Sequence, residues 1–323
     1  MYPECRESGF ARGPTMIPSR PRLKEVLGFL YCHPWRIQGT SIAGEGTVIQ
    51  IPELDVVFDM GSCPRIALSS PLVAISHGHM DHVGGLPYWF SQRVFQKMGV
   101  GKCVCPKRLE RPLINMMASW VPIEHQETPF QIHGLEDLEE VDLKPNIKLR
   151  ALETSHAAAS LGFAAIEYRS KLRPDLAGES QSTLRERRER GEDITMQLEI
   201  PLVAYTGDTE SCATLFRDEF CKSRVVIAEC TFYDPDHRSR AAIGKHLHVQ
   251  DLPELLKVWE AEHVVLIHGT RRTPIEQARQ ILESTIGGEE FERVHMLMDH
   301  RRTRARYEQQ VEAARPHEEP IDG

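Results

Sequence analysis

One stretch of seven residues constrains this chain more than any other, because it concentrates potential metal ligands. It is Ser76-His77-Gly78-His79-Met80-Asp81-His82, and it follows an apolar run, residues 72–75, that predicts a buried strand. His77 and His79 are two residues apart, so in an extended segment both imidazoles lie on the same side. Asp81 and His82 follow where the chain must turn. Three imidazoles and a carboxylate at a strand end predict a zinc site rather than an ordinary polar surface loop.

Length and patterning favour one large domain with a tail at each end. The chain has 323 residues, of which 41% are hydrophobic, so it can bury a sizeable core. Residues 1–27 predict a tail or an edge strap, residues 28–300 the folded domain, and residues 301–323 a charged tail. Within the domain, residues 169–198 are polar and of mixed charge, so we expect an exposed insertion that resembles a short arm.

Charge, hydropathy and cysteine spacing limit the partners and the compartment. Lys and Arg total 39 against 47 Asp and Glu, and the net charge of -8 excludes broad nonspecific nucleic-acid binding while allowing a local basic patch. Residues 1–22 lack the apolar core of a secretory signal, and no apolar run is long enough to span a membrane. The eight cysteines include no CxxC pair, which predicts reduced thiols in a cytoplasmic protein.

Further potential ligands follow the later strands of the predicted sheet. The seven candidate metal ligands are His77, His79, Asp81, His82, His156, Asp208 and His268. In α/β folds, sites lie where strands end, so we expect these side chains to meet. Seven ligands exceed the need of one ion and suit two, which together can clamp the attacking and leaving oxygens of a displacement. Asp59, at the end of another apolar run, either hydrogen-bonds a ligating histidine or caps a turn.

The pattern as a whole resembles the metallo-β-lactamase superfamily and, within it, the tRNase Z family in its short, plant-type form. The resemblance extends from about residue 28 to 282. It rests on Phe58-Asp59-Met60-Gly61, on 76–87, on Ser155-His156 with Ser160-Leu161-Gly162-Phe163, on Thr206-Gly207-Asp208-Thr209, on Glu229-Cys230-Thr231-Phe232 and on His268-Gly269-Thr270-Arg271-Arg272. It implies an α/β (α+β) fold, a four-layer αββα sandwich with one or two zinc ions at the strand ends.

The same resemblance implies a zinc-dependent phosphodiesterase, an endoribonuclease that cleaves the 3′ trailer of precursor tRNA through attack of a metal-bridging hydroxide. One zinc ion would take His77, His79, His156 and Asp208, and the other Asp81, His82, Asp208 and His268. Asp81, Glu229 and His248 would be catalytic, the last two as the acid/base pair that protonates the leaving oxygen. Ser160, Thr270 and Arg272 would bind the substrate. The resemblance also implies a homodimer.

Three departures from the family pattern bear on the substrate. Ala228 replaces the family's histidine before Glu229, and residues 269–273 lack both aromatic rings of the family's Phe-Ser-x-Arg-Tyr segment. Residues 169–198 lack the basic composition of the family's tRNA-gripping arm.

Another hydrolase of the same fold, a small phosphodiesterase, thioesterase or lactonase, is therefore the alternative, and it would not require Glu229 and His248. The complete ligand set argues against a protein that binds zinc only for stability. A redox diiron protein would replace a histidine by a carboxylate and carry a flavin domain, and the sequence does neither.

Overall fold

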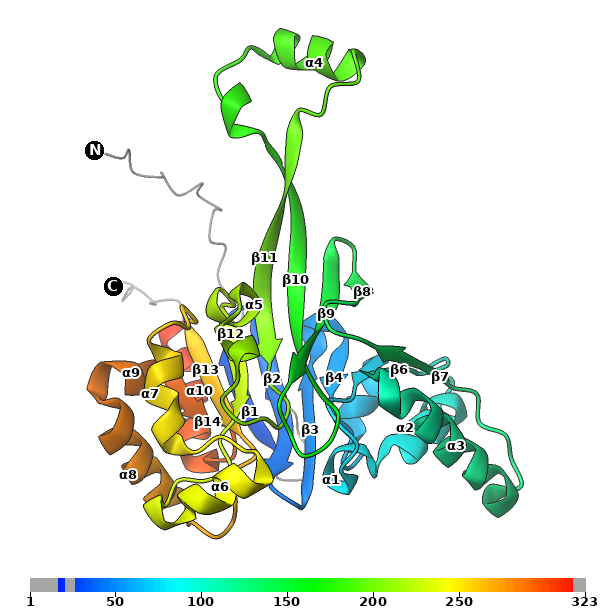
Figure 1. Cartoon of the computed structure of the whole chain (residues 1–323), viewed down its shortest axis with the longest axis vertical. Helices are drawn as coiled ribbons and strands as arrows, with labels where there is room; N and C mark the ends of the chain where they lie inside the picture. Colours follow the sequence, from blue (N-terminus) through cyan, green and yellow to red (C-terminus); the bar gives the residue numbers. More distant parts are fainter. Residues whose placement is uncertain (1–16, 21–26, 316–323) are drawn as a thin grey trace, which may run out of the picture.

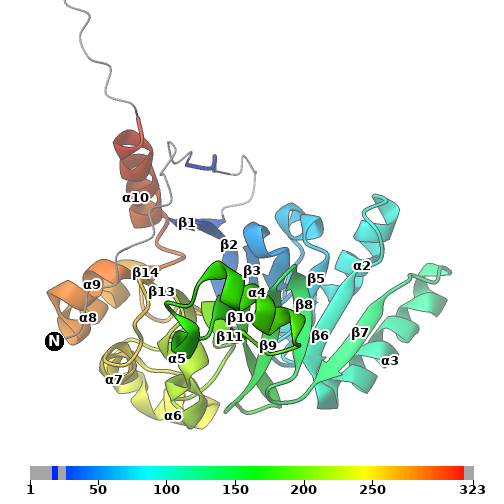
Figure 2. The same ribbon diagram turned by 90° about the horizontal axis from the view of Figure 1, so that it is seen from above.

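The computed structural model describes residues 17–20 and 27–315, and two β-sheets packed face to face dominate it (Figures 1 and 2). The first sheet runs in the order β1 (Gly28–Cys32), β2 (Trp35–Ile42), β3 (Gly46–Ile51), β4 (Val56–Phe58), β5 (Leu72–Ala74), β6 (Lys102–Pro106) and β7 (Gln131–Leu135). The second runs in the order β14 (Val294–Met296), β13 (His263–Ile267), β12 (Val225–Glu229), β11 (Thr195–Tyr205), β10 (Ser160–Leu172), β9 (Ile147–Thr154) and β8 (Glu140–Lys144).

Each sheet is antiparallel in one half and parallel in the other. Strands β1 to β4 pair antiparallel, and β4 to β7 pair parallel. In the second sheet β8 to β11 pair antiparallel, and β11 to β14 pair parallel. Parallel pairing places the carboxyl ends of neighbouring strands at one edge of a sheet. The polar residues that follow β4 and β5 are therefore neighbours, as are those that follow β11, β12 and β13.

Helices cover both outer faces and complete the expected αββα sandwich, which is confirmed. The helices are α1 (Met80–Val83), α2 (Leu86–Phe95), α3 (Lys107–Glu124), α4 (Gln181–Glu189), α5 (Asp218–Cys221), α6 (Arg238–Gly244), α7 (Leu252–Leu256), α8 (Ile275–Ile286), α9 (Gly288–Arg293) and α10 (His300–Ala313). Apolar residues of α2 and α3 pack on the first sheet. Those of α5, α7 and α8 pack on the second sheet.

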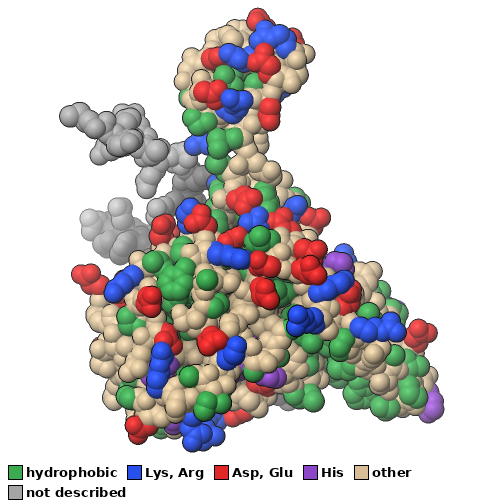
Figure 3. Space-filling model, in the orientation of Figure 1, with side chains coloured by type: hydrophobic (Ala, Val, Ile, Leu, Met, Phe, Trp, Pro, Cys, Tyr) green, Lys and Arg blue, Asp and Glu red, His purple; other side chains and the backbone are tan. Residues whose placement is uncertain are grey.

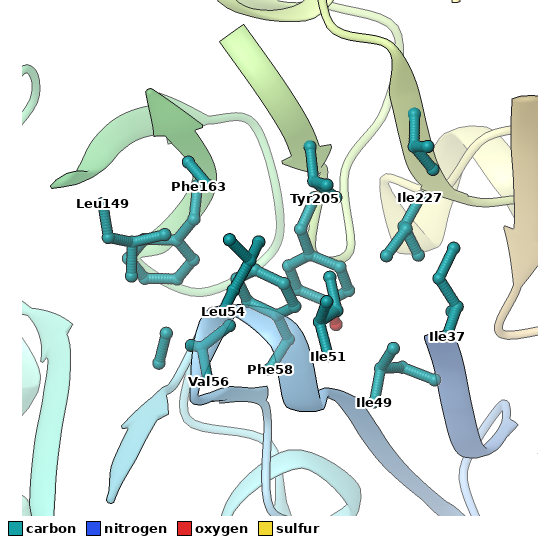
Figure 4. Packing of buried hydrophobic residues seen from close by; sticks show 14 of the residues in the cluster. Ile37, Ile49, Ile51, Leu54, Val56, Phe58, Leu149, Phe163, Tyr205 and Ile227 are labelled. Atoms are coloured by element: carbon teal, nitrogen blue, oxygen red, sulfur yellow. The ribbon is translucent and has the colours of Figure 1, made fainter. Parts of the chain in front are cut away.

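The central core lies between the two sheets and follows from the period-two alternation of strand side chains. In β4, Val56 and Phe58 point into this core, whereas Val57 points to the helices on the outer face. The ring of Phe58 stacks on that of Tyr205 from the opposite sheet, with centroids 4.6 Å apart, and Phe163 packs beside it at 6.2 Å (Figure 4). These aromatic contacts hold the two sheets together at the level of the strand ends that carry the site.

The insertion expected at residues 169–198 stands away from the body as an arm (Figure 1). The strands β10 and β11 extend beyond their neighbours as a two-stranded stalk, which ends in the helix α4. A small apolar cluster of Leu176, Leu184 and Ile194 holds the tip together. The arm is thus longer in space than the sequence suggested, because the pairing of β10 with β11 continues to Leu172 and Thr195.

Residues 301–315 differ from the charged tail expected there, because they form most of α10 and its end. The Asp299 side chain caps this helix by accepting a hydrogen bond from the amide of Arg302. Tyr307 packs edge-on against Phe29 of β1, with ring centroids 5.3 Å apart, and its hydroxyl donates to the carbonyl of Pro18. The rest of the expected tails, 1–16, 21–26 and 316–323, lies outside the described residues. Within the described part of the chain, no helix is long and apolar enough to cross a membrane.

The packing between the sheets yields a stability prediction. Replacing the fully buried Phe163 by alanine should lower the free energy of unfolding by about 3–5 kcal/mol, because it removes a ring from the core and leaves a cavity. Denaturant titration would show this as a lower midpoint with an unchanged slope. As a control, Ile243→Ala on α6, where the side chain is 83% exposed, should change stability by less than about 0.5 kcal/mol. Equal effects of the two changes would contradict the packing described here.

Candidate active site

The histidine-rich stretch lies after β5, at the edge where the parallel strands end. His77 and His79 lie in the loop, and Asp81 and His82 belong to the single turn α1. The amide of His82 donates to the carbonyl of His79 at 2.9 Å, which closes the turn that the sequence required. The four side chains thereby face the strand ends of the second sheet, where the other candidate ligands lie.

Three imidazoles form the first cluster. Nδ1 of His79 lies 2.9 Å from Nε2 of His77 and 3.3 Å from Nε2 of His156. His156 comes from the loop between β9 and β10, so this cluster joins the two sheets. His77 and His156 are buried and His79 is exposed, so one side of the cluster faces solvent. One ligand nitrogen from each ring lies within 4.8 Å of the other two, which is close enough for all three to bind one ion.

Asp81, His82 and His268 form the second cluster, and Asp208 lies between the two. Nε2 of His268 is 3.4 Å from Nε2 of His82 and 3.6 Å from Oδ2 of Asp81. Oδ2 of Asp208 is 3.3 Å from Nε2 of both His82 and His268, and 3.8 Å from Nε2 of His77. The structure therefore brings all seven candidate ligands together in two groups that share one carboxylate.

Hydrogen bonds at Nδ1 orient four of these imidazoles. The partners are the Ser76 hydroxyl for His77 (3.0 Å), the Asp59 carboxylate for His82 (2.8 Å), the Lys245 carbonyl for His156 (3.0 Å) and the Thr231 hydroxyl for His268 (2.8 Å). Each leaves Nε2 directed at the cluster, as a partner behind a metal-ligating histidine does. His79 is the exception and presents Nδ1. Of the two roles considered for Asp59, the structure gives it the hydrogen bond to a candidate ligand.

The turn before Asp208 depends on a glycine. Gly207 has φ of +60°, a left-handed conformation that side chains with a Cβ disfavour. A Cβ there would also lie 2.7 Å from Cβ of Ser76, which follows β5 in the first sheet. The absence of a side chain at residue 207 thus lets the loop after β11 approach the loop after β5. This approach brings Asp208 between the histidines.

The electrostatics of the site match a place for cations. Burial, together with the neighbouring His82, lowers the pKa of His77 to about 2, so its ring is neutral and can act as a ligand. Burial would raise the pKa of Asp208, but the imidazoles of His268 and His82 outweigh burial and hold it well below its usual range. Oδ1 of Asp208 is buried and has no hydrogen-bond partner among the described residues. A buried carboxylate oxygen without a donor, in a cluster that includes the neutral ring of His77, fits a divalent metal ion.

A hydrogen-bonded pair, Glu229 with His246, lies beside these clusters. Glu229 ends β12 and is fully buried, and its Oε1 is 2.9 Å from Nδ1 of His246. The carboxylate also accepts hydrogen bonds from the amide of Thr209 at 2.8 Å and the hydroxyl of Thr231 at 2.7 Å. The His246 ring stacks on that of His268, with centroids 5.4 Å apart. Burial alone would lower the pKa of His246, but the carboxylates of Glu229 and then Asp208 raise it to about 9.

His248, the residue expected to pair with Glu229, lies elsewhere. Its side chain is fully buried and caps the short helix at Val249–Asp251: Nδ1 accepts a hydrogen bond from the amide of Gln250, and Nε2 lies 2.9 Å from the carbonyl of Asp234. The carboxylate of Asp251 accepts a hydrogen bond from the amide of His248 at 2.9 Å. The partner of Glu229 is therefore His246. The sequence held a usable signal, because the acidic residue three positions after His248 marks it as a helix cap.

The three expected substrate-binding residues fall into different settings. Ser160 is buried, and its hydroxyl donates to the backbone carbonyl of Asp208 at 3.2 Å, so it supports the Asp208 loop. Thr270 is partly exposed, and its hydroxyl accepts from the amide of Arg272 at 3.3 Å. Arg272 is exposed, and its guanidinium has no ion-pair partner among the described residues. Thr270 and Arg272 thus remain near the candidate ligand His268 and accessible.

Known proteins share this arrangement of sheets. Residues 64–269 match the beta-lactamase superfamily domain. tRNase Z TRZ1 of Arabidopsis thaliana is 30% identical over 244 residues, which cover 75% of this chain and 87% of that protein. The chloroplastic tRNase Z TRZ2 of the same plant is 28% identical over 250 residues, or 76% and 70% of the two chains. The crystal structure of the short form of human tRNase Z has the same fold, with a TM-score of 0.53 at 15% identity over 84% of this chain and 95% of that one. This chain belongs to the metallo-β-lactamase superfamily and, within it, to the tRNase Z family.

Proposed function

We propose that this chain is a metal-dependent endoribonuclease that cleaves the 3′ trailer from precursor tRNA. The observation that carries the proposal is the pairing of Glu229 with His246 beside the two ligand clusters. Ligand clusters alone suit many hydrolases. A ribose oxygen is a poor leaving group unless it receives a proton, and a histidine held by a buried carboxylate can supply that proton. The similarity to proteins named tRNase Z supports the same conclusion.

The chain's own residues divide the chemical work. His246 donates its proton to the leaving oxygen, and Glu229 fixes the orientation of the imidazole and stabilises its protonated form. Thr209 and Thr231 keep the Glu229 carboxylate in place through their hydrogen bonds. Arg272 binds a phosphate oxygen of the substrate through its unpaired guanidinium. Bound divalent metals would supply an activated water and neutralise charge that develops on the phosphoryl group.

For the metals, we propose two zinc ions per subunit. Imidazole and carboxylate are ligands that suit zinc, and the two clusters match the number of ligands that two ions require. His77, His79 and His156 would hold one ion and Asp81, His82 and His268 the other. Asp208 would contribute to both, because its Oδ2 lies near imidazoles of each cluster.

For the substrate, we infer that this arm binds RNA with lower affinity than a basic arm would. Most of its arginines pair with acids of the same arm, as in the ion pairs of Arg187 with Glu179 and Glu192. Lys171 and Arg188 are exposed and have no ion-pair partner among the described residues. Few phosphates can therefore be neutralised at the arm, and we infer that the salt dependence of tRNA binding is shallow.

For the assembly, we propose a homodimer that buries apolar side chains of the α2 and α3 layer. Phe95 at the end of α2 is 80% exposed, and Ile123 and Trp120 at the end of α3 are 66% and 40% exposed. Hydrophobic side chains gather on the surface over the end of α3 (Figure 3). Groups of exposed large apolar residues are typical of interfaces, so this layer is the surface most suited to a second copy.

For the compartment, we propose the cytoplasm. Cys32, Cys103 and Cys230 are buried, unpaired thiols, as is common in a reducing compartment. Related proteins carry the names chloroplastic and nuclear, so the compartment varies among them. Fluorescence of the tagged full-length protein in an organelle and not in the cytoplasm would contradict this assignment.

The substrate proposal predicts a defined product. The zinc-loaded protein, incubated with a precursor tRNA that carries a 3′ trailer, should cut once after the discriminator base and release an intact trailer. Mapping both fragments by denaturing gel and end-labelling checks this. Hydrolysis of a small phosphodiester, thioester or lactone with the precursor tRNA left intact would favour the alternative hydrolase instead.

The catalytic pair predicts opposite outcomes for two histidines that are two residues apart. His246→Ala should lower single-turnover cleavage of precursor tRNA by about 10²–10⁴-fold, because the leaving oxygen loses its proton donor. His248→Ala should leave cleavage intact and cost about 0.5–2 kcal/mol of stability through the lost helix cap. With bis(p-nitrophenyl) phosphate, whose leaving group needs no proton, His246→Ala should lose much less activity. A larger loss of cleavage from His248→Ala than from His246→Ala would reverse this assignment.

The metal assignment predicts coupled losses of ions and stability. Treatment with a chelator should remove two ions per chain, abolish cleavage and lower the melting temperature, because bound ligand stabilises only the folded state. Added zinc should restore all three. Asp208→Ala should retain fewer than two ions by mass spectrometry of the metal content, whereas His248→Ala should retain both. Full metal content in Asp208→Ala would show that this carboxylate is not shared.

The dimer proposal predicts that charged substitutions in the apolar layer of α2 and α3 lower the molecular mass of the assembly. Light scattering of the wild-type protein should give twice the mass of one chain, and Phe95→Glu with Ile123→Glu should give that of a monomer. The matched change Ile243→Glu on α6, at an isoleucine that is 83% exposed, should leave the dimer intact. A monomeric wild-type protein at micromolar concentration would refute the assembly.

A further inference from the structure

A cavity of about 500 Å³ lies where α10 meets β14, α8 and α9 (Figure 2). None of the seven candidate metal ligands lines it, so it is separate from the active site. Among the described residues four arginines line it, Arg279, Arg301, Arg302 and Arg306, and no lysine does. A guanidinium offers forked, planar donors to an oxyanion, whereas an ammonium acts as a point charge. A wall whose permanent cations are all arginines therefore suits directed hydrogen bonds to an anion.

Three of these arginines have no acidic partner. Arg301 and Arg302 are exposed and Arg306 is partly exposed. Their side chains form no ion pair and no hydrogen bond within the part of the chain that the structure describes. Arg304 on the same helix does not line the cavity, and it pairs with Glu308 at 2.9 Å. The arginines of α10 that face the cavity are thus the ones whose guanidinium groups are free.

The acids around the cavity leave this positive charge uncompensated. The charged side chains of the lining sum to +1, four arginines against three acids, but the acids are unevenly placed. Two of them lie at Arg279: Glu276 pairs with its guanidinium, and Oδ2 of Asp299 is 3.6 Å from its Nε. The third, Glu292, is exposed and has no ion-pair partner among the described residues. Three free guanidinium groups therefore share the cavity with one free carboxylate.

Neutral rings hold two of the free guanidinium groups. The guanidinium carbon of Arg302 lies 5.9 Å from the ring centroid of Phe291 on α9, a cation–π contact. Arg306 lies near His295 and His263, whose Nε2 and Nδ1 are 3.2 Å apart. Burial, and then the Arg306 cation, lower the pKa of His295 to about 3 and that of His263 to about 4, so both rings are neutral. These contacts position the cations without cancelling their charge.

The spacing of the arginines on α10 is unfavourable unless an anion joins them. Arg302 and Arg306 are four residues apart, so they lie on one face of the helix one turn apart, and like charges at this spacing destabilise a helix. Arg301 and Arg302 also lie in the first turn, where the helix dipole is positive and favours negative charge. An anion bound between these side chains would offset both effects.

We propose that this cavity binds a phosphate group. A phosphate has oxygens on several sides and accepts from more than one guanidinium at once, whereas one forked pair of donors satisfies a carboxylate. The volume leaves room for a sugar or base attached to the phosphate. The group can belong to a small phosphorylated molecule or to an RNA backbone, because both present the same oxygens to arginine. The site is new with respect to the cleavage chemistry and does not depend on it.

Calorimetric titration with inorganic phosphate tests the cavity. The double variant Arg302→Gln, Arg306→Gln should bind phosphate at least about 10-fold more weakly than wild type, because charge-assisted hydrogen bonds are lost. Arg304→Gln, the matched control on the same helix, should bind as wild type does. Glu292→Gln should bind more tightly, because the free carboxylate is removed. Any phosphate held at the metal centre is common to all four proteins, and equal metal content confirms that they are folded. Equal affinities of all four would overturn the proposal.

Two further ligands separate the sources of the phosphate. If a small nucleotide is bound, adenosine monophosphate should bind wild type more tightly than inorganic phosphate, and the double variant should lose this gain. If an RNA backbone is bound, the slope of log K for precursor tRNA against log salt should become shallower by about 2 in the double variant, about 1 for each arginine. A loss of phosphate binding alone identifies inorganic phosphate as the ligand. A double variant that binds all three ligands as wild type does would refute the site, whether or not precursor tRNA is cleaved.

Discussion

The buried carboxylate of Asp59 is the interaction on which the active site depends. It accepts hydrogen bonds from the amide and the hydroxyl of Ser76, from Nδ1 of His82 and from the hydroxyl of Tyr205. Tyr205 belongs to the second sheet, and burial with the Asp59 carboxylate keeps the pKa of this phenol well above its usual range, so it remains a donor. One side chain thus joins the two sheets at the level of the candidate metal ligands and fixes the ring of one of them.

The sandwich distributes the site over both sheets in a way that serves the chemistry. The first sheet supplies the dense ligand stretch, whereas the second supplies Asp208, His268 and the Glu229–His246 pair. Since the parallel halves of the two sheets end at a common edge, a ligand cluster and a proton donor can lie within one hydrogen-bonding network. Thr231 shows this link, because its hydroxyl contacts both Glu229 and His268. A change at the Glu229–His246 pair therefore alters the hydrogen bonding of a candidate metal ligand.

The sequence predicted the candidate ligands best where a local pattern, a polar residue after an apolar run, coincides with a contact made in the fold. The candidate ligands were found because each follows an apolar run, and a buried strand with a polar residue at its end has few alternative structures. The residue that pairs with Glu229 was misplaced by two positions, because His246 and His248 are equivalent in composition and only the cap at Val249–Asp251 separates them. A serine at a strand start likewise gives no sign of the backbone carbonyl that the hydroxyl of Ser160 contacts.

By itself the sequence determined the fold class, the ligand stretch and the chemistry that imidazoles and carboxylates can support, since these depend on residue type and on spacing within a strand or turn. Only the tertiary structure decided which histidine meets Glu229, how far the arm extends, and that residues after 300 form a packed helix. Those features depend on contacts between residues far apart in the chain, such as Tyr307 with Phe29. No local pattern encodes such distances, because packing between the sheets sets them.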